Sequence, residues 1–176
     1  MAAVSATATA TASIAIAVKG LLQSNVVGDN AGHEFLVDLS ARLTSGTGAG
    51  SCDRVWYGDR TLAGGATENT DLAGSLTDAM GNSISFAKVK LIIVKNTAAD
   101  GVDGEFGPVT AANGFGIGSV WKAAADKSIV TGGGLFFWYD PNGAAVTAGT
   151  ADLLTMINLS GGTALTYKIL IVGTSV

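Results

Sequence analysis

The sequence has few cysteine, histidine, proline and charged residues. One cysteine and one histidine among 176 residues exclude an internal disulfide framework, a multi-cysteine zinc site and every two-histidine metal motif. Two prolines beside 25 glycines exclude a collagen repeat and a proline-rich linker. Ten basic against 14 acidic residues give a net charge of −4, so nucleic acid is a poor candidate partner. Composition alone favours a β-rich structural domain.

Apolar residues are abundant, although long apolar runs are absent. The mean hydropathy is +0.42, and charged residues make up only 14%. Residues 1–18 are free of cations and have some apolar character, but Thr7, Thr9, Thr11 and Ser13 interrupt them, so they are not apolar enough for a membrane-spanning helix. The first cation, Lys19, follows the apolar part, unlike the order in a signal peptide. We therefore predict no membrane partner, and apolar surface buried against other copies or another protein.

The N-terminal segment alternates alanine with threonine and then places Ile14, Ile16 and Val18 on one face. This period of two predicts an extended arm that ends in a strand. The expected organisation is an extended N-terminal arm over residues 1–25 and a single β-sandwich domain over residues 26–176. The three aliphatic residues are candidate interface residues, because an arm of this kind becomes ordered against neighbours.

The rest of the chain reads as short strands separated by turns. Strand patterns occur at His33–Leu39, Val55–Tyr57, Ile84–Lys95, Leu135–Tyr139, Leu153–Leu159 and Thr166–Val172. Gly74–Met80 is the one stretch with mild helical character. Short strands with regularly spaced turns predict an all-β fold, a β-sandwich of the jelly-roll type.

The segment Asp140-Pro141-Asn142-Gly143 follows an aromatic strand pattern. Asp at the first, Pro at the second and Gly at the fourth position is what a type I turn prefers. The sequence therefore predicts that the chain reverses here into a hairpin.

Nucleophilic and nucleotide-binding chemistry finds little support. His33 and Cys52 are the only candidates for a base and a thiol nucleophile, and nothing in their flanking residues supports such a pair. A hydrogen-bonded histidine and an inert thiol are expected instead. The glycine clusters at residues 46–50 and 114–118 lack the spacing of a phosphate-binding loop, so we expect ordinary loops.

The acidic residues suggest two further sites. Asp100–Glu105 has the composition of a calcium loop. An EF-hand requires a ligand at the third position of its loop, and this segment has none there. Asp53 with Asp59, or Glu68 with Asp71, are candidates for the carboxylate pair of a glycosidase. Solubilising and turn-capping roles are the expected ones. We predict no catalytic, metal-binding or cofactor-binding residues and no cofactor.

The aromatic residues allow two interpretations. Trp56, Tyr57, Trp121, Trp138 and Tyr139 have the chemistry of a sugar-stacking platform. Aromatic residues on strands more often belong to a core or a subunit interface. Trp121, Trp138 and Tyr139 are therefore predicted as interface residues.

Three segments resemble a family of small structural proteins of tailed bacteriophages. They read DLAGSLTDAMGNSISFAKVKLIIVKNT (Asp71–Thr97), GGGLFFWYDPNGAAVTAGTADLL (Gly132–Leu154) and TYKILIVGTS (Thr166–Ser175). The Leu-Ala-Gly-Ser-Leu-Thr-Asp and Val-Thr-Ala-Gly-Thr-Ala-Asp strings are the most specific part of the match, and they occur in the same order as in that family. The resemblance implies a non-enzymatic virion component with a jelly-roll-like sandwich.

Together with the arm, this resemblance favours a capsid decoration or cement protein on the capsid surface of the virion. Its expected partners are the major capsid protein, whose subunits it would bridge, and copies of itself. A homo-oligomer is expected, with a trimer as one option at local three-fold positions. The alternative within the virion is a head spike or tail-fibre knob that binds host glycans. A small β-sandwich enzyme acting on carbohydrate is the alternative from another class.

Overall fold

The chain divides into two compact units, Met1–Ser45 and Gly46–Val176. The computed structural model describes residues 12–22, 33–78, 80–109 and 113–176. The division lies further along the chain than the boundary expected between residues 25 and 26. Side-chain surroundings are described from Leu43 onward, so the packing expected of Ile14, Ile16 and Val18 lies outside the described residues.

The first unit contains two long antiparallel strands, β1 (Ala12–Leu22) and β2 (His33–Ser45). The register places Ile16 opposite Leu39 and Val18 opposite Val37. The strand predicted at the end of the N-terminal segment is therefore present, and it is paired with the strand that follows it. The arm function of this segment stays a prediction.

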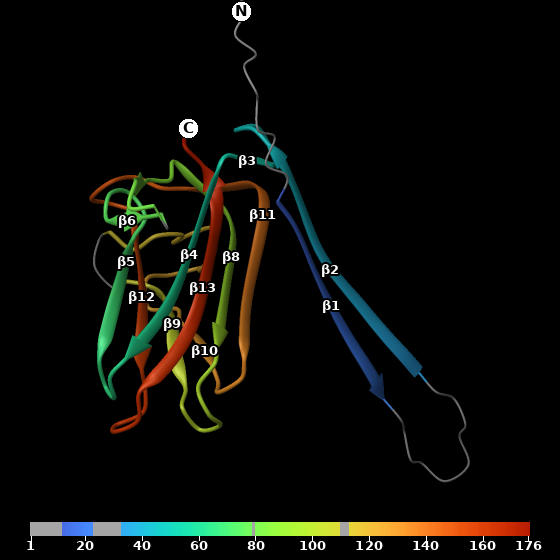
Figure 1. Cartoon of the computed structure of the whole chain (residues 1–176), viewed down its shortest axis with the longest axis vertical. Helices are drawn as coiled ribbons and strands as arrows, with labels where there is room; N and C mark the ends of the chain where they lie inside the picture. Colours follow the sequence, from blue (N-terminus) through green and yellow to red (C-terminus); the bar gives the residue numbers. More distant parts are fainter. Residues whose placement is uncertain (1–11, 23–32, 79, 110–112) are drawn as a thin grey trace, which may run out of the picture. The chain divides into compact units, whose positions relative to one another are not determined.

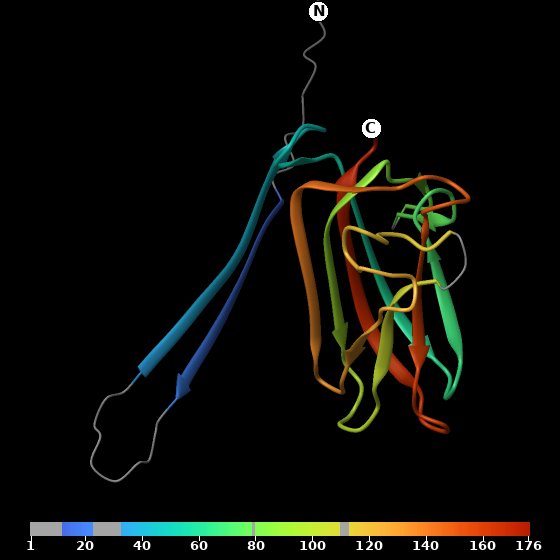
Figure 2. The same cartoon turned by 180° about the vertical axis from the view of Figure 1, so that it is seen from behind.

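The second unit contains all the other strands. They are β3 (Ser51–Cys52), β4 (Arg54–Leu62), β5 (Thr67–Asp71), β6 (Leu76–Thr77), β7 (Ser83–Ile84), β8 (Lys88–Asn96), β9 (Gly104–Pro108), β10 (Ser128–Val130), β11 (Leu135–Ala145), β12 (Leu153–Asn158) and β13 (Leu165–Thr174). Two four-stranded sheets have the orders β11-β8-β13-β4 and β10-β9-β12-β5, and β6 pairs with β7. Both larger sheets can be followed in Figure 1 and Figure 2.

The pairing in these two sheets is nested. β4 pairs with β13, β5 with β12, β8 with β11 and β9 with β10, all antiparallel. The first of the eight strands thus lies beside the last, the second beside the seventh, the third beside the sixth and the fourth beside the fifth. The prediction of an all-β fold is confirmed, since the described residues form strands and turns and no helix.

One core takes side chains from both four-stranded sheets. Trp56, Ile92 and Ile169 come from the first sheet and Phe106 and Leu154 from the second, and all five belong to one cluster of buried side chains. From Ile92 onward the burial along β8 follows the alternation of a strand, with Ile92 fully buried inside and Ile93 only half-buried. Each sheet therefore has one face in the core and one face directed outward.

The predicted hairpin at Asp140–Gly143 is wrong. β11 pairs with β8 both before and after this segment, with Tyr139 opposite Leu91 and Ala144 opposite Val89. Between these two pairs the chain advances five residues along β11 but only two along β8. The segment therefore forms a bulge, and the strand continues in its original direction. The local turn chemistry is present, since the Asp140 carboxylate accepts a hydrogen bond from the backbone N–H of Asn142 at 2.8 Å. Pairing with β8 on both sides prevents a reversal.

Gly143 makes this bulge possible, and its replacement by alanine is expected to cost about 2 kcal/mol of unfolding free energy. Its φ is +78°, and a Cβ would lie 2.9 Å from the Val89 carbonyl oxygen. Gly149 is the matched control, because its φ is +74° but a Cβ there would meet nothing within 4 Å. Gly149→Ala should cost about 1 kcal/mol. Urea denaturation measures both, and equal losses would contradict the role given to the Val89 contact.

The helical character expected at Gly74–Met80 is also wrong for the described residues of that stretch. Hydrogen-bonded turns precede the short strand β6 there. Leu72 and Leu76 are both buried in the core, which determines the path of this segment more strongly than its weak helix propensity. Within the described part of the chain, no helix has the length and apolar character needed to cross a bilayer.

Candidate functional site

The outward face of the β11-β8-β13-β4 sheet carries an apolar row that crosses all four strands. Tyr57 lies opposite Leu170, Leu170 opposite Ile93 and Ile93 opposite Phe137. Their strand neighbours, such as Trp56 and Ile92, belong to the core, so these four side chains point outward. Tyr57 is 51% exposed and the other three are half-buried. We call these four residues the outer strip.

The next row of residues on the same face is charged, and it borders the outer strip on one side. Asp59 lies opposite Lys168, and Lys168 opposite Lys95. The Lys168 ammonium lies 2.8 Å from the Asp59 carboxylate and donates a hydrogen bond to the Tyr57 hydroxyl at 2.9 Å. The hydrogen bond from Lys168 lowers the pKa of Asp59, and the same bond raises the pKa of Lys168. Both groups are therefore charged at neutral pH.

A loop closes the other side of the outer strip. Lys90 is 1% exposed, and its ammonium group donates to the carbonyl oxygens of Gly48 and, at 2.7 Å, Ser51. The backbone N–H of Gly50 donates to the carbonyl of Pro141 at 2.9 Å. Residues 46–53 are thus fixed to β8 and β11. Burial lowers the pKa of Lys90, and the nearby charge of Lys88 lowers it further.

Cys52 lies in this loop and is 5% exposed. Burial raises the pKa of its thiol, and Lys90 opposes this effect only in part. A buried thiol with a raised pKa is a poor nucleophile. His33 begins β2 in the other unit, and its side chain lies outside the described residues, so the pairing of His33 with Cys52 stays untested.

The structure separates the three aromatic residues predicted at an interface. Trp121 is 6% exposed, and its ring stacks on that of Phe136 with a centroid distance of 6.0 Å. Trp138 is partly buried and packs against the core. Tyr139 is half-buried on the outward face, opposite Leu91. Of the three, Tyr139 is the one beside the outer strip.

The carboxylates considered as a glycosidase pair each have a structural partner. Asp53 accepts a hydrogen bond from the Ser175 N–H, and Asp71 accepts one from the Ala73 N–H, both at 2.8 Å. Glu68 accepts one from the hydroxyl of Tyr167 at 3.0 Å. Burial and the nearby Glu68 charge raise the pKa of Tyr167. These contacts are the turn-capping and structural roles that the sequence suggested.

The Asp100–Glu105 segment does not gather its side chains around one point. Val102, at the third position, is 6% exposed and belongs to the core. Asp103 accepts a hydrogen bond from the Gly132 N–H at 3.2 Å. Among the residues that the structure describes, no group of three or more His, Cys, Asp or Glu side chains is placed to hold a metal ion.

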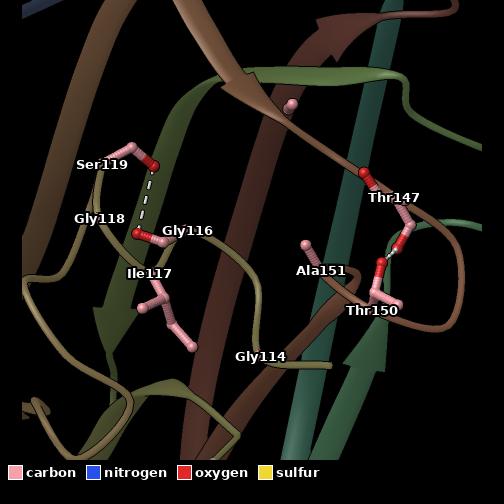
Figure 3. A pocket seen from close by; sticks show the side chains of 9 residues that line it. Gly114, Gly116, Ile117, Gly118, Ser119, Thr147, Thr150 and Ala151 are labelled. Atoms are coloured by element: carbon pink, nitrogen blue, oxygen red, sulfur yellow. Dashed lines mark hydrogen bonds between the residues drawn. The ribbon is translucent and has the colours of Figure 1, made fainter. Parts of the chain in front are cut away.

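A shallow groove of about 570 Å³ lies elsewhere on this unit (Figure 3). Its lining consists of Gly114, Gly116, Ile117, Gly118, Ser119, Ala145, Thr147, Thr150 and Ala151. The Ser119 hydroxyl donates to the Gly116 carbonyl at 3.2 Å, and the Thr150 hydroxyl donates to the Thr147 carbonyl at 3.4 Å. None of these nine residues is ionisable, so the groove offers shape and hydroxyl groups rather than acid–base chemistry.

The two most specific strings of the phage resemblance meet in the structure. The backbone N–H of Leu72, in the first string, donates to the carbonyl of Asp152, in the second, at 2.8 Å. Asp152 also closes its own turn by accepting a hydrogen bond from the Gly149 N–H at 2.5 Å. Both strings therefore have structural roles, as core leucines and as a turn.

The described strands make the chain an all-β protein, and the outer strip gives one of its sheets a partly exposed apolar outward face. No protein-family model matches the chain, and no curated protein matches it. Ile93, Phe137 and Leu170 of the strip, and Lys90 beside it, were not singled out from the sequence. The available signal was that Ile92-Ile93-Val94 is apolar on both faces, which suits a strand buried in a sheet centre, and that Leu135–Tyr139 is an aromatic strand pattern.

Proposed function

We propose that residues 46–176 form a jelly-roll sandwich and that the chain is a non-enzymatic structural protein of a tailed-phage virion. The observation that carries this proposal is the nested pairing of the eight strands. A long antiparallel ribbon rolled up in this way, with its strands divided between two sheets, is the jelly-roll arrangement common in viral capsid proteins. The resemblance of Asp71–Thr97 and Gly132–Leu154 to phage structural proteins supports the same role.

Within the virion, the proposed role is capsid decoration or cement. The chain has a compact unit with its own core and a separate two-stranded unit at its N-terminus. A separate β-unit of this kind can cross a subunit boundary and contribute backbone pairing or apolar contacts to a neighbour. Many modest contacts become strong when repeated over a lattice. The protein would bridge major capsid subunits on the capsid surface through its N-terminal arm and its β-domain.

The structure gives less support to a spike or fibre knob that binds glycans. Stacking on a sugar needs an exposed aromatic face. Trp56 and Trp121 are 4% and 6% exposed, and Trp138 packs against the core. Tyr57 is the most exposed of the aromatic residues considered for such a platform, and its hydroxyl is hydrogen-bonded to Lys168.

Deletion of residues 1–45 is expected to leave a folded β-domain that binds capsid shells about tenfold more weakly or worse. The cut follows the division of the chain, because a shorter deletion through residue 19 would remove most of β1 and most of the pairing that β1 gives to β2. Cooperative thermal unfolding checks the fold, and co-sedimentation with purified shells measures binding.

Cryo-electron microscopy of the same shells locates the full-length chain. Copies at every equivalent lattice position would support decoration. Undiminished binding of the truncated chain would contradict the arm's role. A few copies confined to one vertex or to the tail would favour a spike or fibre component instead.

A further inference from the structure

Two asparagine–glycine pairs occur in the chain, Asn113-Gly114 and Asn142-Gly143. An asparagine followed by glycine is able to modify itself, because no Cβ hinders the approach of the glycine nitrogen to the asparagine side chain. The glycine nitrogen attacks the side-chain Cγ, a new C–N bond forms, and the amide nitrogen leaves as ammonia with the proton of the glycine N–H. Water then opens the resulting imide ring at either of its carbonyl groups, which gives aspartate or isoaspartate.

The Asn142-Gly143 pair lies in the bulge of β11, outside the pairing with β8. That pairing includes Tyr139 before the bulge and Ala144 after it. Asn142 is exposed, so water reaches its side-chain amide. Its backbone N–H donates to the Asp140 carboxylate at 2.8 Å, whereas ring closure requires rotation about the Cα–C bond on the other side of the residue. Strand pairing therefore does not oppose the rotation that brings the reacting atoms together.

The Asn113-Gly114 pair has the same chemistry in a more restrained setting. The Asn113 carbonyl accepts hydrogen bonds from the backbone N–H groups of Asp152 and Leu153, both at 3.0 Å. Gly114 is buried and forms a β-bridge with Leu153. Ring closure at Asn113 must disrupt these contacts by local opening, which lowers its rate. The chain thus contains an internal control for the pair in the bulge.

We propose that Asn142 is a site of spontaneous deamidation and isoaspartate formation, and that this modification releases the loop of residues 46–53. Isoaspartate adds a backbone carbon between residues 142 and 143. The backbone at Gly143 is tightly enclosed, since a Cβ there would lie 2.9 Å from both the Val89 carbonyl oxygen and Cγ of Lys90. The strand is also paired with β8 on both sides of the bulge. The added length therefore displaces the more exposed residues of the bulge, Pro141 and Asn142.

Displacement of Pro141 acts directly on the loop. The Pro141 carbonyl accepts a hydrogen bond from the Gly50 N–H at 2.9 Å, and this contact holds the loop to β11. Cys52 lies in the same loop and is 5% exposed, so its thiol reports on the release. The inference does not rest on the virion role, because the reaction needs only the folded chain and water.

The first test measures deamidation at both positions by peptide mass spectrometry, after incubation of the purified full chain at mildly alkaline pH. Position 142 should convert at least about tenfold faster than position 113. The same chain in urea is the reference, because without the fold the two pairs should convert at similar rates. Electron-transfer fragmentation distinguishes isoaspartate from aspartate. Protection of position 142 by the fold that equals the protection of position 113 would overturn the proposal.

The second test measures the reaction of Cys52 with a thiol reagent before and after the incubation, with a reductant removed just before each assay. The rate should rise at least about threefold in the fraction that contains isoaspartate. Asn142→Gln is the matched control, since glutamine must close a larger ring and reacts far more slowly, and its thiol reactivity should stay constant. Freshly purified Asn142→Asp has the new charge on a backbone of normal length and should react like the wild-type chain. Unchanged reactivity of the isoaspartate fraction, or an equal rise in Asn142→Gln, would contradict release of the loop.

Discussion

Replacement of Asn158 by aspartate is expected to lower the free energy of unfolding by about 3 kcal/mol or more at neutral pH. Asn158 is 1% exposed. Its amide nitrogen donates to the carbonyl oxygens of Leu62 and Ala63 at 3.0 Å and of Thr163 at 2.8 Å. A carboxylate donates to none of them and places a buried negative charge beside three acceptors. The loss follows from both the unpaired carbonyl groups and the uncompensated charge.

The Asn158 amide connects two loops that are in close contact. Leu62 and Ala63 lie where β4 turns into β5, and Thr163 lies in the turn between β12 and β13. A Cβ on Gly64 would lie 2.8 Å from the backbone nitrogen of Gly162, so the two turns have no room to rearrange around a new side chain. The cost of the substitution should therefore remain high after relaxation.

The pH dependence separates the charge from the lost hydrogen bonds. Burial raises the pKa of the introduced carboxyl group above its ordinary value. Between the two values the folded state binds more protons than the unfolded state, so the variant loses stability as the pH rises through that window. Urea denaturation should show a smaller loss at about pH 4 than at about pH 7. Asn69→Asp, at an exposed position of β5, is the control and should change stability by less than about 0.5 kcal/mol. A loss at position 158 that is independent of pH would contradict the role of charge.

Lys90→Ala is expected to cost about 3 kcal/mol of unfolding free energy. The substitution leaves the carbonyl groups of Gly48 and Ser51 without the ammonium donor and removes a buried aliphatic stem. Lys88→Ala is the matched control, because Lys88 is exposed on the same strand. Its replacement should change stability by less than about 0.5 kcal/mol.

Two further measurements test the loop contact directly. The folded-state pKa of Lys90 is lowered, so the unfolded state binds more protons between that value and the ordinary one. The wild-type chain therefore gains stability as the pH rises through this window, and the alanine variant lacks that gain. The Cys52 thiol should also react faster with a thiol reagent in Lys90→Ala, because the loop that covers it is loosened. Unchanged thiol reactivity would show that the contact does not hold the loop.

Local patterns predicted much of the fold. The strands around Val55–Tyr57, Ile84–Lys95 and Leu153–Leu159 were expected and are present as β4, β8 and β12. Alternation of apolar and polar residues and enrichment in β-branched side chains are properties of a single strand, so the sequence alone reveals them. Asp140–Gly143 shows the limit of this approach. Its turn chemistry is local and was recognised, but whether a turn reverses a strand or bulges out of it depends on the partner strand.

The sequence by itself determined the class of this protein, all-β with few ionisable groups available for chemistry, and the approximate positions of β1, β2, β4, β8, β11, β12 and β13, but not those of β5, β9 and β10. Only the tertiary structure decided which strands are neighbours. Tyr57, Ile93, Phe137 and Leu170 come from four strands that are distant in sequence, and pairing alone brings them into one row. Strand order and register arise from long-range hydrogen bonds and a shared core, which no window of the sequence contains. For this reason an apolar residue of the outer strip looks, in the sequence, like any other residue of a buried strand.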